Sequence, residues 1–138
     1  MLFGAWDQQL HNLDSERGRE AWFYKTNGFI NSSPAVANDM VYVGSKDSTL
    51  YALKISTYEL KWKQSTQGEI ASSPTIANGV VYVGSWDHNL YAFDAQKGDL
   101  LWRYQTQDGI ESSPTVVDGV VYVGSRDHTL YAFHLPGS

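Results

Sequence analysis

Carboxylate side chains that could bind Ca²⁺ recur in this chain at a fixed spacing of 40 residues. A calcium site needs several carboxylate oxygens that converge on one point. An acid that is used identically in every copy of a repeat instead serves the scaffold, where it accepts hydrogen bonds from the backbone of its own turn. We therefore interpret the repeated acids as turn caps and not as a calcium site; they are Asp7, Asp47, Asp87 and Asp127.

The four histidines could act as metal ligands or proton carriers. His88 and His128 occupy the same turn position in neighbouring copies, while His11 and His134 fall in predicted strands. Turn residues often adopt the left-handed backbone conformation, which histidine tolerates better than most side chains. We interpret His88 and His128 as such turn residues, with metal ligation as the alternative.

Paired serines at 32–33, 72–73 and 112–113 are the candidate nucleophiles. A nucleophilic serine needs an adjacent general base, and no base follows these pairs at a fitting position. Their repetition again favours a role in the scaffold. The sequence therefore predicts a protein that is not an enzyme, with no catalytic residue, no bound cofactor and no metal.

The same period of 40 residues governs the whole chain. The run VYVGS begins at positions 41, 81 and 121, and the run LYA begins at positions 50, 90 and 130. Self-similarity at a period of about 20–50 residues indicates one supersecondary unit stacked on copies of itself, because a single unit cannot bury its own apolar faces.

Each copy is predicted to form four short strands. In the third copy these are 73–77, 80–85, 90–93 and 100–104, and Asn78-Gly79 between the first two suits a type I′ hairpin turn. The second strand is apolar on both faces, so we expect neighbours to cover both. The fold class is therefore all-β, a β-propeller of four-stranded antiparallel blades.

The copies divide the chain into about three and a half blades within a single repeat domain. We predict a partial blade at 1–26, full blades at 27–66 and 67–106, a partial blade at 107–135 and a tail at 136–138.

One segment of the third copy carries a family motif. The spacing Ala92-x-Asp94-x-x-Lys97-Gly98-x-x-x-Trp102 is similar to the tryptophan-docking motif of the pyrroloquinoline quinone (PQQ)-type propeller repeat, which usually has Thr in place of Lys97. The preceding VYVGSxDxxLYA resembles that family's other hallmark.

The second copy departs from this motif, because Lys54 and Tyr58 replace the Asp and the Gly, and we expect a less regular turn there. The repeated tryptophans should be packing anchors between blades; they are Trp22, Trp62 and Trp102.

The frame of the repeats leaves both ends of the array open. The chain begins at a second strand and its last blade ends after a third, so apolar faces and edges would be exposed. Two chains arranged head to tail would close a ring of eight blades, the number common in the family. Alternatively, the strand around Trp22 completes the partner's last blade and displaces residues 1–14, which gives six. Either way we expect a homodimer.

Function is expected where the copies differ. The loops between blades and the turns between second and third strands open on one face of a propeller. The varying residues of that face form a predicted surface for protein or peptide recognition; they are Phe29, Asn31, Lys46, Glu69, Trp86, His88, Glu111, Arg126 and His128.

Two classes of function fit these features. The first is a non-catalytic binding or scaffold module. The second is a fragment of a PQQ-dependent quinoprotein dehydrogenase, but the family's enzymes use PQQ with Ca²⁺ and often a vicinal Cys-Cys pair, and this chain has no cysteine. An excised or engineered repeat array with no separate activity is a third reading, favoured by the gapless period.

Composition limits the classes of partner that the chain is expected to bind. The net charge is −5 and no Lys/Arg cluster exists, which argues against nucleic acid. No segment has the pattern of a signal peptide or a membrane span, so no membrane insertion is expected. The compartment stays open, although the resemblance points outside the cytoplasm.

Overall fold

The computed structural model describes residues 2–5, 7–13 and 20–135 of the chain. Within these residues it contains fourteen strands in four antiparallel sheets and no helix. The first sheet comprises β1 (Leu2–Gly4), β2 (Gln9–Leu13) and β3 (Glu20–Lys25). The second comprises β4 (Ala35–Ala37), β5 (Met40–Gly44), β6 (Thr49–Lys54) and β7 (Glu59–Ser65).

The other two sheets repeat the same plan. The third comprises β8 (Thr75–Ala77), β9 (Val80–Gly84), β10 (Asn89–Asp94) and β11 (Leu100–Gln105). The fourth comprises β12 (Thr115–Val117), β13 (Val120–Gly124) and β14 (Leu130–His134). The first sheet therefore lacks an inner strand and the last lacks an outer one.

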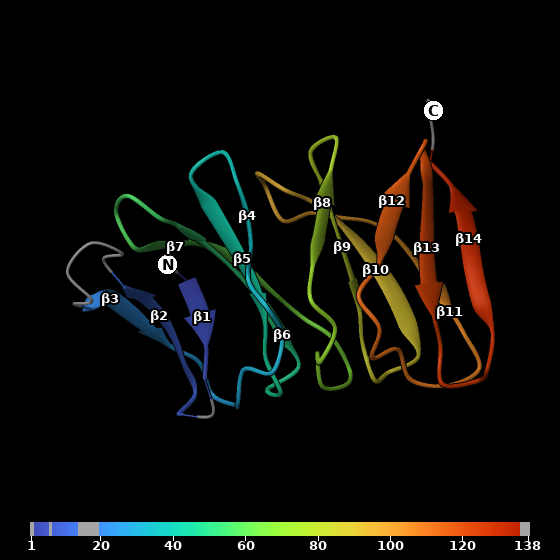
Figure 1. Ribbon diagram of the computed structural model, residues 1–138, viewed down its shortest axis with the longest axis horizontal. Coiled ribbons are helices and arrows are strands. Elements are labelled where there is room, and N and C mark those ends of the chain that lie inside the picture. The colour runs from blue at the N-terminus through green and yellow to red at the C-terminus, as the bar shows by residue number, and fades with distance from the viewer. Residues whose placement is uncertain (1, 6, 14–19, 136–138) are drawn as a thin grey trace.

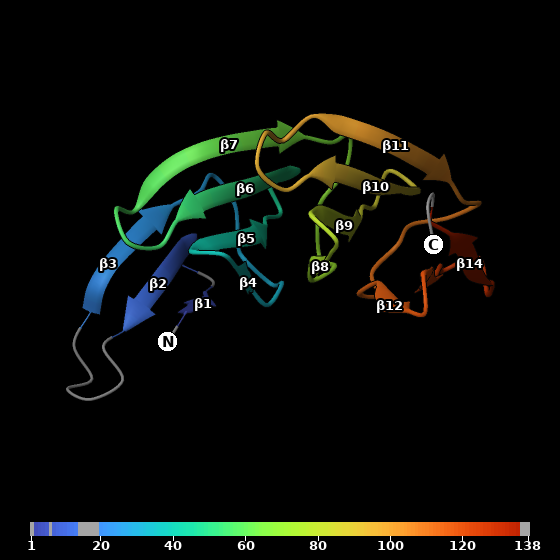
Figure 2. The same ribbon diagram turned by 90° about the horizontal axis from the view of Figure 1, so that it is seen from above.

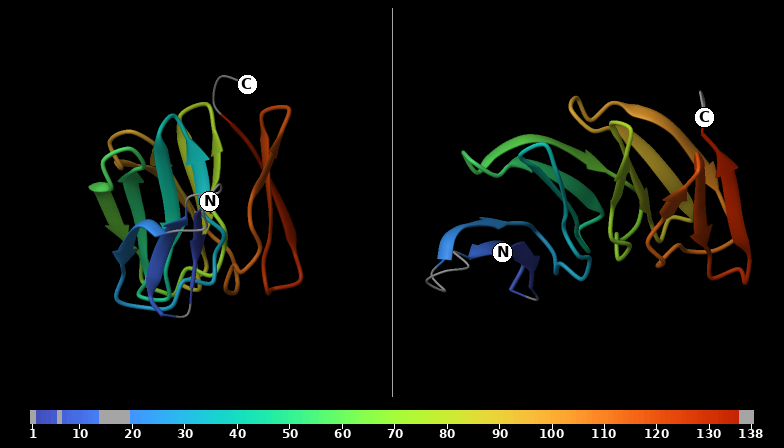
Figure 3. Two further views of the ribbon diagram at one scale, coloured as in Figure 1. Left: turned by 60° about the vertical axis from the view of Figure 1, so that its left-hand side comes forward. Right: turned by 45° about the horizontal axis from the view of Figure 1, so that its top comes forward.

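The four sheets stand side by side along an arc (Figure 1). Viewed from above, β3, β7 and β11 follow its convex side and β4, β8 and β12 its concave side (Figure 2). Two further views show the first and last sheets at the ends of the arc (Figure 3). The predicted fold class, a propeller of four-stranded blades with about three and a half blades per chain, is confirmed.

No helix in the described residues has the length and apolar character to cross a membrane. The predicted tail at 136–138 lies outside these residues.

The turns between the first two strands of the third and fourth sheets have the predicted conformation. Asn78 and Gly79 both take left-handed backbone angles, with φ of 50° and 76°. Asp118 and Gly119 follow with 49° and 73°. This pair of positive φ values is what a type I′ hairpin turn requires, and it aligns the twist of the two strands.

The core lies between consecutive sheets. β5 and β9 are buried on both faces, as their doubly apolar sequence predicts. Tyr82, Leu90 and Ala92 of the third sheet are buried in one cluster with Val121 and Val123 of the fourth. Each sheet therefore depends on the next to cover its apolar face.

A glycine at the end of the VYVG runs of the second and third sheets allows the next blade to approach closely. A Cβ placed on Gly84 would lie 2.1 Å from the Cγ2 atom of Ile110, which begins the following blade. Gly44 and Ile70 form the same contact one copy earlier. Only glycine leaves room for the isoleucine side chain at this point.

Trp62 is buried between the second and third sheets. Its Nε1 donates a hydrogen bond to the carbonyl oxygen of Ala95 at 3.0 Å. A Cβ on Gly98, whose φ is 79°, would lie 2.5 Å from the indole ring. Asp94 keeps this turn in shape, because its Oδ1 accepts the backbone N–H groups of Gln96 and Lys97.

Trp22 occupies the equivalent position one copy earlier but has a different partner. Tyr58 stands where Gly98 stands in the next copy and keeps the left-handed angle, with φ of 48°. Its ring lies against that of Trp22 at a centroid distance of 6.0 Å. The backbone turn is retained, and the departure from the motif instead leaves Trp22 Nε1 buried without a hydrogen-bond partner.

Trp102 is only half-buried. It contacts Tyr82 and Phe133 at centroid distances of 6.0 Å each, so it still bridges two sheets. Among the described residues the last sheet has no strand beyond β14, and this tryptophan is less completely buried than Trp62.

The two buried tryptophans give a matched test of the docking interaction. We expect Trp62→Phe to lower the free energy of unfolding by about 1 kcal/mol more than Trp22→Phe, because only Trp62 loses a hydrogen bond. The carbonyl oxygen of Ala95 keeps its second donor, the hydroxyl of Tyr42. Urea denaturation at one protein concentration measures both. Equal losses would show that the bond to Ala95 contributes nothing.

Candidate functional site

The varying residues lie along one side of the arc, at the lower edge of Figure 1. There the loop that leads into each sheet contacts the turn between that sheet's second and third strands. The backbone N–H of Trp86 donates to the carbonyl oxygen of Glu69 at 2.9 Å, and that of Lys46 donates to Phe29 at the same distance. We call this side the loop face; its predicted residues are Phe29, Asn31, Lys46, Glu69, Trp86, His88, Glu111, Arg126 and His128.

Beneath the loop face, the repeated acids cap their own turns as predicted. Asp87 Oδ1 accepts the backbone N–H of Asn89 at 2.9 Å. Its Oδ2 accepts the N–H of Gln67, in the loop that precedes the sheet, at 3.0 Å, and also the hydroxyl of Tyr91. Asp47 and Asp127 make the same three kinds of contact.

Two members of this network were not predicted from the sequence. The tyrosine of each LYA run is one, because its hydroxyl reaches the acid four residues earlier. The threonine that directly follows each outer strand is the other: Thr106 Oγ1 lies 2.8 Å from the carbonyl oxygen of His88 and 2.7 Å from that of Asp108. Their recurrence at 40-residue spacing was the available signal.

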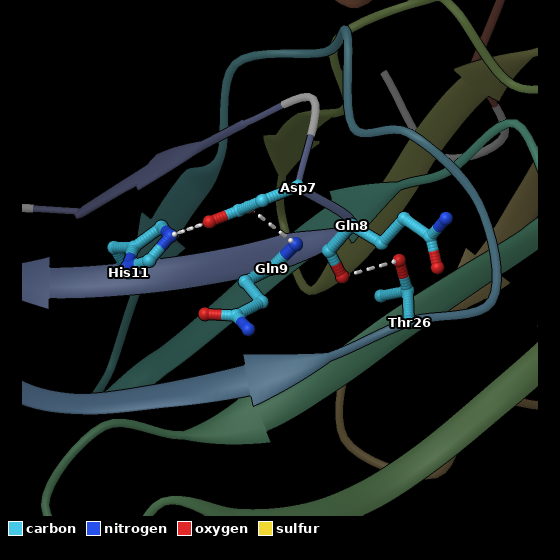
Figure 4. A network of polar contacts seen from close by, with 5 residues as sticks. All are labelled: Asp7, Gln8, Gln9, His11 and Thr26. Carbon is cyan, nitrogen blue, oxygen red and sulfur yellow. Dashed lines mark hydrogen bonds and ion pairs between the residues drawn. The ribbon is translucent and has the colours of Figure 1, made fainter.

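The first copy has a histidine in place of the tyrosine (Figure 4). His11 Nε2 lies 2.9 Å from Asp7 Oδ2, and Asp7 Oδ1 accepts the N–H of Gln9 at 3.0 Å. Thr26 Oγ1 lies 3.0 Å from the carbonyl oxygen of Gln8. The histidine thus takes the structural place of tyrosine and keeps the acid in its capping role.

These contacts set the ionisation of the acids. The hydroxyl of Tyr131, together with backbone N–H groups, lowers the pKa of Asp127 to about 2. Burial and the bond to Asp87 raise the pKa of Tyr91 to about 12. A carboxylate that holds its proton so weakly is a poor general base at neutral pH.

The serine pairs also belong to the scaffold. Ser32 Oγ donates to the carbonyl oxygen of Gly44 at 2.9 Å and accepts its N–H at 3.1 Å. The second serine of each pair links neighbouring sheets: Ser33 N–H donates to Ser73 Oγ at 2.8 Å, and Ser73 N–H donates to Ser113 Oγ at 3.0 Å.

Three of the predicted loop-face residues come together at the junction of the third and fourth sheets. The guanidinium carbon of Arg126 lies 4.7 Å from the centre of the Trp86 ring. Arg126 Nη1 lies 3.8 Å from Glu111 Oε1, and both side chains are about half exposed. Trp86 lies against Gly109 and keeps 37% of its surface exposed. The result is an amphipathic cluster on a rigid base.

The remaining predicted residues lie farther along the same face. Phe29 keeps 37% of its surface exposed, and Asn31 is exposed. His88 is half-buried and His128 is exposed. Both take the expected left-handed backbone, with φ of 79° and 70°. Among the described residues, no group of three or more metal-ligating side chains converges.

Comparison with protein-family models gives a match to the family described as outer membrane protein assembly factor BamB, over residues 5–74 and 62–136. Comparison with curated protein sequences gives no significant match.

Solved propellers have the same fold. BamB from Moraxella catarrhalis superposes with a TM-score of 0.87 at 23% sequence identity, over 97% of this chain and 42% of that one. The computationally designed Ika4 and Ika8 proteins each give a TM-score of 0.87 at 20% identity, over 97% of this chain. The match covers 84% of Ika4 and 42% of Ika8. This chain therefore spans less than half the length of the BamB chain.

The low pKa of Asp127 predicts a pH-dependent contribution to stability. Its folded pKa of about 2 lies below the ordinary value of about 3.9, so the stabilisation is complete above pH 5 and is lost as pH falls toward 2. We expect the stability difference between the wild type and Asp127→Asn to narrow over that range. Urea denaturation at fixed protein concentration from pH 6 to pH 2.5 measures it, and a constant difference would contradict the assignment.

Trp86 should contribute little to stability although it is an aromatic residue. The second and fourth copies carry Lys46 and Arg126 at its position, and its ring forms an exposed cation–π pair with Arg126. We expect Trp86→Lys to cost about 1 kcal/mol or less. The matched comparison is Trp62→Ala, for which burial predicts about 3–5 kcal/mol. Similar losses for the two variants would show that Trp86 belongs to the core.

Proposed function

This chain belongs to the PQQ-type β-propeller repeat family, whose matching model is described as outer membrane protein assembly factor BamB, and from this premise we propose that it is a non-catalytic scaffold for protein or peptide recognition. The observation that carries the proposal is the division between fixed and varying residues. Every repeated polar group described above is engaged in holding turns and sheets, whereas the varying side chains gather on the loop face.

The loop face has the chemistry of a recognition surface. Aromatic residues and arginine are enriched where proteins bind one another, because they combine apolar area with directed hydrogen bonds. Trp86 and Arg126 supply both, and Glu111 holds the guanidinium from one side. The description of the matched family as an outer membrane protein assembly factor supports an interaction function and a location outside the cytoplasm.

Two other readings are less well supported. A quinoprotein dehydrogenase needs a base of suitable pKa, and the acids of the loop-face network are engaged in structural hydrogen bonds. An excised or engineered repeat array is the second candidate, and the likeness to two designed propellers favours it. Under either hypothesis, scaffold or repeat array, the apolar faces at the ends of the arc still need to be covered.

The last sheet presents a face that elsewhere in the chain is an interface between blades. Leu90 is fully buried, while the equivalent Leu130 is 71% exposed. Tyr82 is 2% exposed, while Tyr122 is 38% exposed. The residue types are the same, so the difference in exposure arises because no following sheet covers this face among the described residues.

We propose that a second copy supplies this sheet and closes the ring as a homodimer. At each junction within the chain, the equivalent face is covered by the sheet that follows. In a dimer, the first sheet of the second copy would take the place of that following sheet. Two copies of the matched region would span most of the BamB chain, since one spans 42% of it. β1 is paired with β2, and β2 with β3, which favours eight sheets over six because the six-sheet form displaces residues 1–14.

Molar mass in solution tests ring closure. We expect light scattering at micromolar concentration to give twice the chain mass, and Leu130→Glu to give the mass of one chain, because a carboxylate cannot be buried at this contact without a partner. Leu101→Glu is the matched control: Leu101 is also an exposed leucine, at 49%, but lies on β11 and not on the last sheet, and the variant should stay dimeric. A monomeric wild type would contradict the proposal.

A further inference from the structure

A cleft opens between the second and third sheets on the side opposite the loop face. Its volume is about 730 Å³, within the range of about 300–1,000 Å³ that is typical of small-molecule sites. Met40, Tyr42 and Ile76 contribute apolar surface. Lys54 and Lys61 contribute the cations of its wall.

This pair of lysines is found only in the second copy. The positions equivalent to Lys54 carry Asp14, Asp94 and His134, and those equivalent to Lys61 carry Ala21 and Leu101. The backbone plan is the same in each copy, so the fold does not require a lysine at either position.

The position of Lys54 no longer has to cap the following turn, because another residue of the second copy provides that cap. In the third copy Asp94 caps the turn that follows it. In the second copy the cap comes from Asp39, whose Oδ1 accepts the N–H of Ser56 at 3.2 Å and whose Oδ2 accepts its hydroxyl at 2.6 Å. The acid has moved to the neighbouring hairpin turn, and a cation now lines the cleft.

The charges around the cleft favour an anion. Lys61 Nζ lies 3.4 Å from Glu59 Oε2 in an ion pair that is largely exposed, and such pairs contribute little and are easily exchanged. Asp94 also lines the cleft, but its Oδ1 is held by two backbone N–H groups of its own turn. Among the residues that line the cleft, two lysines therefore stand beside one carboxylate that is already hydrogen-bonded.

We propose that this cleft binds a small organic carboxylate with an apolar body. The carboxylate lies between the ammonium groups of Lys54 and Lys61, where charge-assisted hydrogen bonds form. The apolar body packs on Met40, Tyr42 and Ile76. Both walls come from a single chain, so the site exists whether or not the ring closes and whether or not the loop face binds a partner.

The test uses naphthalene-2-carboxylate as the probe and its neutral carboxamide as the matched ligand. Calorimetric titration into the full chain should show binding of the carboxylate and at least about tenfold weaker binding of the carboxamide, because the amide forms no charge-assisted bonds. In ¹H–¹⁵N spectra the carboxylate should shift the backbone amides of Asn78, Gly79 and Gln96, which line the cleft.

Two double variants separate this cleft from general attraction by positive charge. K54D/K61L introduces the residue types of the third copy and should weaken carboxylate binding about tenfold or more. K25D/K63L makes the same change in charge at exposed lysines outside the cleft and should change the affinity less than twofold. The far-ultraviolet circular dichroism of both variants should match the wild type.

Three results would overturn the proposal. One is the absence of carboxylate binding at millimolar concentration. Another is equal affinity of the two double variants, or of the carboxylate and the carboxamide. The third is a set of shifted amides confined to β13 and β14, which would place the probe on the uncovered face of the last sheet.

Discussion

The structure depends on one constraint: the sheets in the middle of the array are apolar on both faces, and such a sheet is stable only when a neighbour covers each face. The second strands supply valine to one side and tyrosine to the other, and the glycine that ends them allows an isoleucine of the next blade to approach. Trp22 and Trp62, on the outer strands of the first and second sheets, each add a contact to a turn of the following blade. Each sheet is therefore covered by the next, whereas the outward apolar face of the last sheet remains uncovered.

The polar groups fall into two sets, those that recur in every copy and support the stacked sheets and those that differ between copies. Those that recur at every copy, such as Asp87 with Tyr91, hold loops and turns in place between sheets that are themselves held by burial. Because the scaffold is secured by these repeated contacts, other positions are free to vary. Residues that differ between copies form two groups: the cluster around Trp86 on the loop face, and the lysine pair on the opposite side between the second and third sheets.

Much of the fold could be predicted from sequence, because its determinants are local and repeated. The strands, the left-handed pair Asn78-Gly79 and the incomplete blades at both ends follow from the spacing alone. Features that depend on neighbours 17 or more residues away could not be predicted. The unpartnered Nε1 of Trp22 reflects a change in the next copy, and the cap from Asp39 reflects an exchange between two turns. The contact of Arg126 with Trp86 joins two different copies, and the spacing of the repeats does not indicate it.

We propose that the uncovered face of the last sheet is an interface between blades, which a second copy completes. Amide hydrogen exchange tests this proposal, because β13 and β14 repeat β9 and β10 almost residue for residue. At a protein concentration well above that of half-dissociation, we expect the amides of β13 to approach the protection of those of β9, and we expect dilution to lower the protection of β13 first. Fast exchange in β13 at every concentration, beside slow exchange in β9, would contradict it.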